Sequence, residues 1–181
     1  MISLFCCRLI FGTALCWLLM PRSLVTFGFF RIQHFVALGL AVTAALTLQP
    51  DDSALLATSV TRGIDIAIAV IAYVGSVIWT LGRRTLGLVS IVTILLLSAV
   101  AIAGTMSVPT GEGAPSAAWW YAAELSSAWL VGSVTTAMLL GHWYLTATAM
   151  PLKPLQRLNQ FLLSAAVLRL LMAGGGLLSC P

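Results

Sequence analysis

Charged residues are scarce in this sequence. Only 8% of its 181 residues are Asp, Glu, Lys or Arg, whereas a soluble domain carries roughly a quarter. Hydrophobic residues make up 60% of the chain, which is more apolar surface than a soluble fold can bury. These two proportions exclude an ordinary soluble domain. They predict a chain that lies in a lipid bilayer, where each span needs about 20 mostly apolar residues.

The sequence also lacks the short motifs that would assign a reaction. It has no phosphate-binding glycine loop, no nucleophile elbow, no HExxH zinc motif and no dinucleotide fingerprint. Glu112 and Glu124 do not form a recognisable acid/base pair. Whether the protein is an enzyme is left open, and a non-catalytic membrane subunit is the favoured interpretation.

The cysteines and the net positive charge do not indicate a metal ion or a nucleic acid as a partner. The four cysteines form no CxxC and no Cys/His metal spacing, so we expect ordinary apolar helix residues. The nine basic residues exceed the five acidic ones, a bias that cytoplasmic loops alone produce. We therefore expect no nucleic acid partner.

Uncharged apolar runs, separated by charges and by Pro or Gly, predict an all-α fold. We expect a polytopic membrane helix bundle of about six transmembrane helices with short loops, forming one integral membrane domain over residues 1–181. The first run is of signal-peptide length but has no small-residue cleavage site before Pro21, so we expect it to remain as a helix. The predicted spans are 2–20, 28–48, 64–82, 86–105, 123–148 and 159–179.

The loop charges predict an orientation, because Lys and Arg are retained in the cytoplasm during insertion. All five acidic residues lie in or beside the second and fourth loops, together with Arg62. The first, third and fifth loops hold Arg22, Arg31, Arg83, Arg84, Lys153 and Arg157. We therefore expect a multi-pass protein of the inner (plasma) membrane of the cell, with both termini outside the cytoplasm.

Aromatic residues agree with this topology, since Trp and Tyr prefer the level of the lipid headgroups. Trp17, Trp79 and Trp143 lie toward predicted inner ends, and Trp119 opens the fifth span from outside.

Small residues predict where helices pack closely in lipid. Ser133, Ala137 and Gly141 form a ladder on the fifth span, and Gly39 with Thr43 forms a shorter one on the second.

Two histidines, His34 and His142, are the first candidate site residues. Each is predicted in the cytoplasmic half of the bilayer, at similar depth and on different helices. Two such imidazoles are the minimum for binding the iron of a single haem b from opposite faces, and they could equally hold a quinone headgroup. The alternative is structural, in which each histidine bonds a backbone carbonyl or hydroxyl on a neighbouring helix.

Arg169 is the third candidate, because it lies near the middle of the sixth span, where a cation needs a partner. Candidate partners are Asp65, Glu124, an anionic ligand or a ring of backbone carbonyls at Gly174–Gly176. The alternative is that the long side chain reaches the interface. Arg62 and Asp65, three residues apart, are expected to pair with each other.

Three functions remain open from the sequence. The first is a small haem b or quinone-binding electron-transfer subunit that uses His34 and His142. The second is a structural or assembly subunit of a larger membrane complex, with other membrane subunits as partners. The third is a small transporter in which Arg169 contacts an anionic solute.

Overall fold

The computed structural model describes residues 1–49, 55–106, 116–146 and 151–178. Within these ranges the chain forms six α-helices and no strand. Each helix contains a stretch that is long and apolar enough to cross a membrane. The predicted all-α, six-helix membrane bundle is therefore confirmed. The helices are α1 (Ile2–Leu19), α2 (Phe27–Thr47), α3 (Leu55–Thr80), α4 (Arg84–Thr105), α5 (Ala117–Thr146) and α6 (Lys153–Leu178).

Three helices begin earlier than the sequence predicts. The α3 helix begins at Leu55 instead of residue 64, α5 at Ala117 instead of 123, and α6 at Lys153 instead of 159. The predicted spans stopped near charged residues, because a charge in lipid is costly. In the fold Arg62 has a partner, because it donates to the Leu48 carbonyl oxygen at 2.7 Å. A partnered charge does not have to end a helix.

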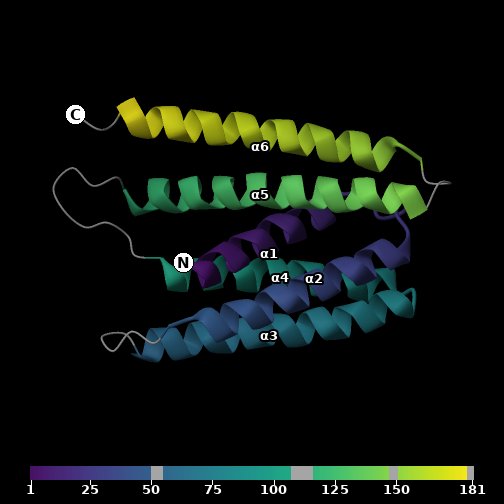
Figure 1. The fold of residues 1–181 in the computed structure, drawn as a ribbon, viewed down its shortest axis with the longest axis horizontal. Coiled ribbons are helices and arrows are strands. Elements are labelled where there is room, and N and C mark those ends of the chain that lie inside the picture. Colours follow the sequence, from purple (N-terminus) through teal and green to yellow (C-terminus); the bar gives the residue numbers. More distant parts are fainter. Residues whose placement is uncertain (50–54, 107–115, 147–150, 179–181) are drawn as a thin grey trace.

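Successive helices run in opposite directions, and the turns after α1 and α3 lie at the same end as the start of α6 (Figure 1). We call this the basic end, because Arg22, Arg83 and Lys153 belong to it. The α3–α4 turn is short because Gly82 adopts a left-handed φ of 69°. The Arg83 N–H then donates back to the Ile78 carbonyl oxygen at 3.3 Å.

Helices α1 to α4 form a four-helix core in which each helix packs against two of the others. Trp17 and Trp79 are almost completely buried in it, together with Phe30 and Ile94. Both residues lie in the last turn of their helices at the basic end, but their side chains face the core and not the lipid headgroups. Both indole rings fill the space between helices, where a large aromatic side chain gains more contact than at the surface.

The α5 helix joins this core through α1. Gly12 and Gly132 let the two backbones touch, since a Cβ added to Gly132 would lie 2.1 Å from the Gly12 carbonyl carbon. The buried Ser133 hydroxyl lies 3.4 Å from Cys16 Sγ across the same contact. Small residues on α5 therefore bring it close to α1.

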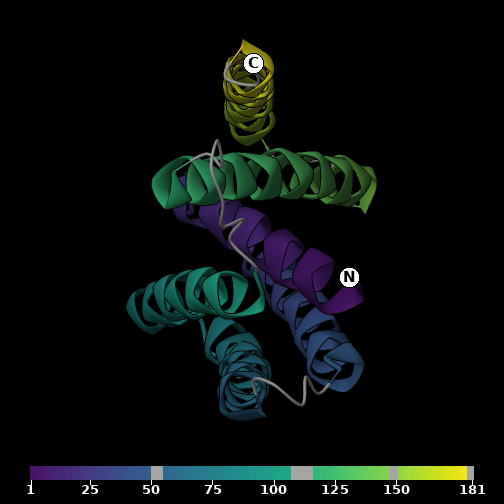
Figure 2. The same cartoon turned by 90° about the vertical axis from the view of Figure 1, so that its left-hand side faces the viewer.

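The α6 helix packs mainly against α5 and lies at the edge of the molecule (Figure 2). In its most apolar stretch only 11% of residues are buried, compared with 56% in α1. The hairpin of α5 and α6 is thus an outer layer, joined to the four-helix core through one face of α5.

The two predicted small-residue ladders have different environments. Ser133 contacts α1, and Ala137 packs partly against the core. Gly141 and Gly39 have no neighbouring atom within 4 Å of an added Cβ, and Thr43 is exposed. Only the Ser133 end of the first ladder is a helix contact within the described chain.

Candidate functional sites

His34 lies in the centre of the four-helix core with no exposed surface. Its Nδ1 lies 2.8 Å from the Phe30 carbonyl oxygen one turn earlier, and its Nε2 lies 3.1 Å from the Ser90 hydroxyl of α4. A carbonyl can only accept, so Nδ1 carries a proton and donates it to Phe30. In a neutral ring Nε2 can only accept, and it shares the single Ser90 hydroxyl proton with the Gly87 carbonyl oxygen, which lies 2.7 Å from Ser90 Oγ.

The packing around Nε2 is tight. A Cβ added to Gly75 of α3 would lie 2.7 Å from Nε2 and 2.4 Å from Cδ2 of His34. Glycine at position 75 therefore lets the imidazole fit between α2, α3 and α4. Haem iron bound at Nε2 would have to displace the Ser90 contact and part the helices at Gly75.

Indole rings complete the surroundings of His34. Trp17 of α1 stacks on the imidazole with ring centroids 5.4 Å apart and planes at 25°. Trp79 of α3 stacks on Phe30 at 4.4 Å, and a Cβ on Gly87 would lie 2.6 Å from its ring. The histidine and its aromatic neighbours thus connect all four helices of the core.

The polar atoms of this region are incompletely paired. Gln33 Oε1, Trp17 Nε1 and Trp79 Nε1 are buried and have no hydrogen-bond partner among the described residues. Each buried unpaired polar group costs about 1–3 kcal/mol. The core around His34 therefore carries hydrogen-bonding capacity that the described side chains do not use.

His142 has a different environment, because its side chain is exposed on α5. The aromatic residue that follows it makes an interhelical contact instead: Trp143 Nε1 donates to the Thr26 hydroxyl at 2.9 Å. Tyr144 donates its hydroxyl proton to the Pro151 carbonyl oxygen at 2.6 Å. His34 is buried and hydrogen-bonded while His142 is on the surface, so the arrangement as it stands does not fit a haem held between them.

A second group of candidate residues lies toward the opposite end of the bundle. Arg8 is the seventh residue of α1, and Glu124 is the eighth of α5. Asp65 is the eleventh residue of α3, and Arg169 is nine residues before the last residue of α6. At 1.5 Å per residue these four ionisable groups lie roughly 9–15 Å from the ends of their helices, within the span.

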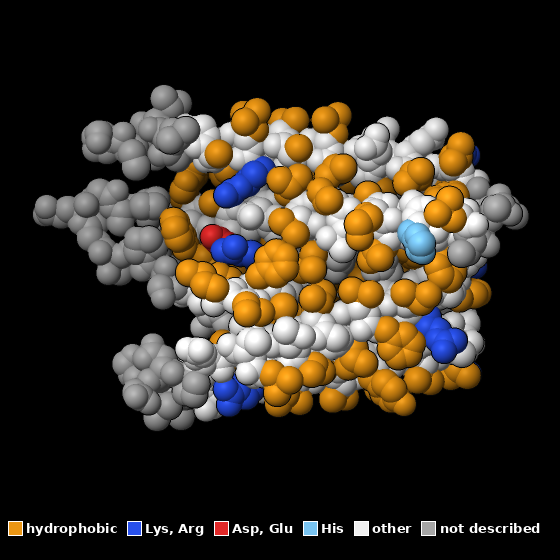
Figure 3. Space-filling view, in the orientation of Figure 1, with side chains coloured by type: hydrophobic (Ala, Val, Ile, Leu, Met, Phe, Trp, Pro, Cys, Tyr) orange, Lys and Arg blue, Asp and Glu red, His pale blue; other side chains and the backbone are white. Residues whose placement is uncertain are grey.

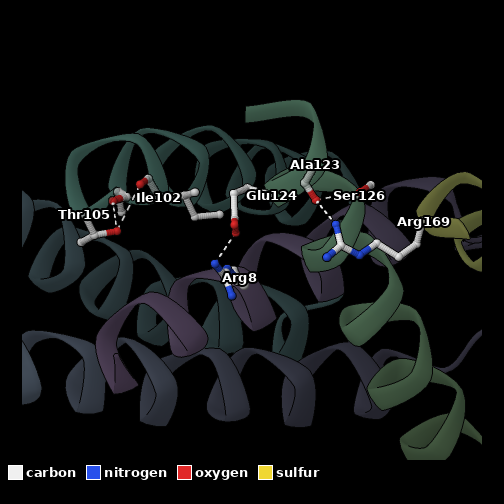
Figure 4. Close-up of polar contacts among 8 residues, drawn as sticks. Arg8, Ile102, Thr105, Ala123, Glu124, Ser126 and Arg169 are labelled. Carbon is white, nitrogen blue, oxygen red and sulfur yellow. Dashed lines mark hydrogen bonds and ion pairs between the residues drawn. The ribbon is translucent and has the colours of Figure 1, made fainter. Parts of the chain in front are cut away.

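Arg8 and Glu124 form an ion pair between α1 and α5 (Figure 4). Both side chains are mostly buried, at 27% and 17% exposure. A charge inside a membrane is tolerated when it meets an opposite charge, because the pair needs less solvation than two separate ions. It is the only ion pair between described residues, and it joins the outer hairpin to the core next to the Gly12–Gly132 contact.

Asp65 lies fully buried between α1 and α3. Its Oδ1 accepts from the Cys7 thiol at 3.5 Å, and its Oδ2 has no partner among the described residues. The predicted pair between Arg62 and Asp65 is wrong, because Arg62 bonds to Leu48 instead. A spacing of three residues puts two side chains on one helical face. The Asp65 carboxylate is nevertheless turned toward Cys7 of α1, whereas Arg62 reaches the end of α2.

Arg169 lies on α6 and reaches toward α5 (Figure 4). Its Nη1 donates to the Ala123 carbonyl oxygen of α5 at 2.9 Å, a partner that the sequence does not predict. Glu124, the next residue, is already paired with Arg8. Arg169 is only partly buried and has no ion pair with any described carboxylate.

The described residues also enclose a cavity of about 630 Å³ at the end opposite the basic one. Arg8 and Glu124 line it, with Thr47, Gln49 and Thr105 from neighbouring helices. The ion pair therefore borders open space as well as protein.

Sequence reasoning missed the partners of several site residues. Arg8 and Glu124 could have been paired from their similar depth, since both lie seven or eight residues from the same end of the bundle. Nothing in the sequence marks Cys7 as the neighbour of Asp65, or Ser90 as the neighbour of His34. Those contacts depend on how the helices are rotated, which apolar composition does not specify.

Among the described residues, no three His, Cys, Asp or Glu side chains come together as a metal-binding group. Comparison with protein-family models, with curated proteins and with solved structures finds no match.

Proposed function

We propose that this protein is a structural subunit of a larger membrane complex, in which α6 binds a transmembrane helix of another protein that carries an acidic side chain. The observation behind this proposal is Arg169. It places a guanidinium within the span of the least buried helix, with one hydrogen bond to the described chain.

The guanidinium of Arg169 has unused hydrogen-bonding capacity. An arginine side chain has five N–H donors, and the bond from Nη1 to Ala123 uses one of them. At the centre of a membrane an arginine costs at least about 2.5–3.5 kcal/mol on insertion scales. A partner carboxylate would offset this cost with two parallel charge-assisted hydrogen bonds.

The chain's own carboxylates near this depth are engaged elsewhere. Glu124 pairs with Arg8, and Asp65 is buried against Cys7 on the far side of α1. The complementary charge for Arg169 is therefore expected from another chain. A Glu or Asp on one face of an apolar helix is the chemistry that fits.

The surface around Arg169 suits helix docking. Val167, Leu170 and Leu171 are 50%, 73% and 66% exposed, so they present aliphatic side chains beside the guanidinium. Figure 3 shows that hydrophobic side chains dominate the viewed face, with charged groups isolated among them. Aliphatic packing alone gives little preference for protein over lipid, and the buried charge pair would supply the specificity.

Site-specific photo-crosslinking in the native membrane tests this proposal. A benzophenone side chain replaces Leu170 beside Arg169, and in a control chain it replaces Val77, 44% exposed on α3 at the other edge of the molecule. We expect a discrete protein adduct from position 170 and lipid adducts from position 77. The crosslinked peptide should contain a transmembrane Asp or Glu.

Charge variants complete the test. Arg169→Gln should abolish the protein adduct, and Arg169→Lys should keep most of it, because the cation is retained. Replacing the partner's acidic residue by its amide should have the same effect as Arg169→Gln. Lipid adducts alone at position 170, or an adduct with a second copy of this chain, would overturn the proposal.

We also propose the orientation that the loop charges predict, with the basic end in the cytoplasm and both termini outside. Cysteines introduced at Arg83 and Lys153 should then react only with membrane-permeant thiol reagents in intact cells. Cys180, which lies outside the described residues, is replaced by serine in these variants, and the other native cysteines, Cys6, Cys7 and Cys16, are buried and give little background. Labelling of either introduced cysteine by an impermeant reagent would contradict this orientation.

A second candidate function is solute transport, which the cavity beside Arg8 and Glu124 favours. A small anionic solute entering there would compete with Glu124 for the Arg8 guanidinium. Reconstituted liposomes should then show anion flux that Arg8→Gln abolishes. Absence of flux for a panel of small organic and inorganic anions would exclude this function.

A further inference from the structure

A second cavity, of about 540 Å³, lies at the basic end of the bundle. Three arginines from separate elements line it: Arg22 from the α1–α2 turn, Arg84 at the start of α4, and Arg157 near the start of α6. No acidic residue lines the cavity, and none of the three forms an ion pair with a described carboxylate. We propose that this cavity binds the phosphate group of an anionic membrane lipid.

Arg22 gives the clearest sign of a missing anion. Its Nη1 atom is buried and has no hydrogen-bond partner among the described residues. A buried charged donor without an acceptor is costly, and a phosphate oxygen is a strong acceptor for guanidinium groups. Arg22 also lines the cavity, so rotation of its guanidinium would bring this donor to an anion bound there.

The first turn of α4 adds to the positive potential. Arg84 and Thr85 of that turn line the cavity, and Arg83 at the N-cap makes no side-chain hydrogen bond to it. The first N–H groups of a helix have no partner within the helix and carry a partial positive charge. A phosphate beside this turn could therefore accept from backbone as well as from guanidinium groups.

The rest of the lining indicates a lipid as the source of the phosphate. Leu18 and Leu19 from the last turn of α1 and Leu88 from the second turn of α4 line the cavity together with the three arginines. Aliphatic side chains next to cations at the end of a membrane bundle match a phosphate headgroup attached to an acyl chain. Three cations without a carboxylate disfavour a zwitterionic headgroup, since its choline group would meet like charge.

Native mass spectrometry of the delipidated full chain in a nonionic detergent tests the site. Dioleoylphosphatidylglycerol, dioleoylphosphatidylcholine and inorganic phosphate are each titrated as probes. We expect phosphatidylglycerol to bind more tightly than phosphatidylcholine, and inorganic phosphate to bind much more weakly than either lipid. Arg22→Gln and Arg157→Gln should each weaken phosphatidylglycerol binding about fivefold, the factor that corresponds to about 1 kcal/mol per arginine at an anionic surface.

Arg31→Gln is the matched control, because Arg31 is exposed near the same end and does not line the cavity. It removes the same charge and should leave the affinity nearly unchanged. An equal loss in Arg31→Gln would reduce the effect to general surface attraction and overturn the site. Equal binding of the two lipids, or inorganic phosphate binding as tightly as phosphatidylglycerol, would overturn the assignment to an anionic lipid.

Arg157 keeps the test interpretable if Arg22→Gln misfolds. Its side chain is exposed, so its replacement should leave the unfolding temperature of the lipid-free protein unchanged. The phosphatidylglycerol-induced rise in unfolding temperature should nevertheless become smaller in Arg157→Gln. An undiminished rise in that variant would contradict the proposal.

Discussion

The four-helix core and the α5–α6 hairpin are both apolar enough to cross a membrane, but they differ in how they use their side chains. In the core, helices are fixed by interlocking rings around His34, with glycines at the points where rings meet backbones. In the hairpin, α6 contacts mainly α5 and exposes most of its aliphatic side chains. Hydrophobicity therefore places both regions in the membrane. The fit between side chains on neighbouring helices decides which region is packed internally.

Polar groups differ between the two regions in the same way. His34 uses both ring nitrogens inside the core, whereas Arg169 on α6 makes one hydrogen bond. Substitutions that remove or add side-chain atoms should therefore lower the unfolding free energy most in the core and at its junction with α5. On the outer face of α6, substitutions should weaken the proposed complex with a partner helix more than they destabilise the isolated chain.

The largest effect is expected at the junction of the two regions. Gly132→Ala would place a Cβ 2.1 Å from the Gly12 carbonyl carbon, far inside van der Waals contact, which forces α5 away from α1. We expect a loss of about 3 kcal/mol in unfolding free energy, at the upper end for overpacking because backbone cannot yield as a side chain can. Reversible unfolding in detergent measures it. Gly141→Ala on the same helix meets no neighbour and should be neutral.

His34→Ala should cost about 2–3 kcal/mol, because it removes two hydrogen bonds and leaves a cavity among packed rings. His142→Ala should change stability by less than about 0.5 kcal/mol, since its side chain is exposed. Thermal unfolding in detergent compares the two. The same samples test the haem b hypothesis: a coloured protein whose visible spectrum disappears in both variants would favour electron transfer over the structural role.

The Arg8–Glu124 pair allows a double-mutant cycle across the junction. Arg8→Gln and Glu124→Gln should each destabilise by about 1–2 kcal/mol, since each leaves a partly exposed charge unpaired in the span. The double variant should lose less than the sum, which gives the coupling energy. Strictly additive losses would mean that the ion pair does not hold α5 against α1.

The smallest effect is expected on the outer face of the hairpin. Leu170 is 73% exposed, so Leu170→Ala should change the stability of the isolated protein by less than about 0.5 kcal/mol. Lipid tails solvate alanine and leucine similarly enough that no cavity forms. Chemical unfolding in detergent provides the measurement. A loss comparable to that in His34→Ala would show that α6 is packed internally, and the contrast between the two regions would fail.

Much of the fold can be predicted from the sequence. The apolar runs locate six helices, but the charge of Arg62 made the third predicted span too short, because its partner Leu48 lies at the end of another helix. The candidate sites are only partly predictable. Depth along a helix brings Arg8 and Glu124 to one level, while rotation about the helix axis separates buried His34 from exposed His142.

The sequence by itself determined that this protein is a membrane helix bundle, because no other environment accommodates so many apolar residues with so few charges. Only the tertiary structure decided which polar side chains have partners. Transfer into lipid depends on composition summed over a span, and pairing depends on the position of individual atoms. The unpaired Nη1 atom of Arg22 and the single hydrogen bond of Arg169, on which the two proposals depend, became visible only once the helices were placed together.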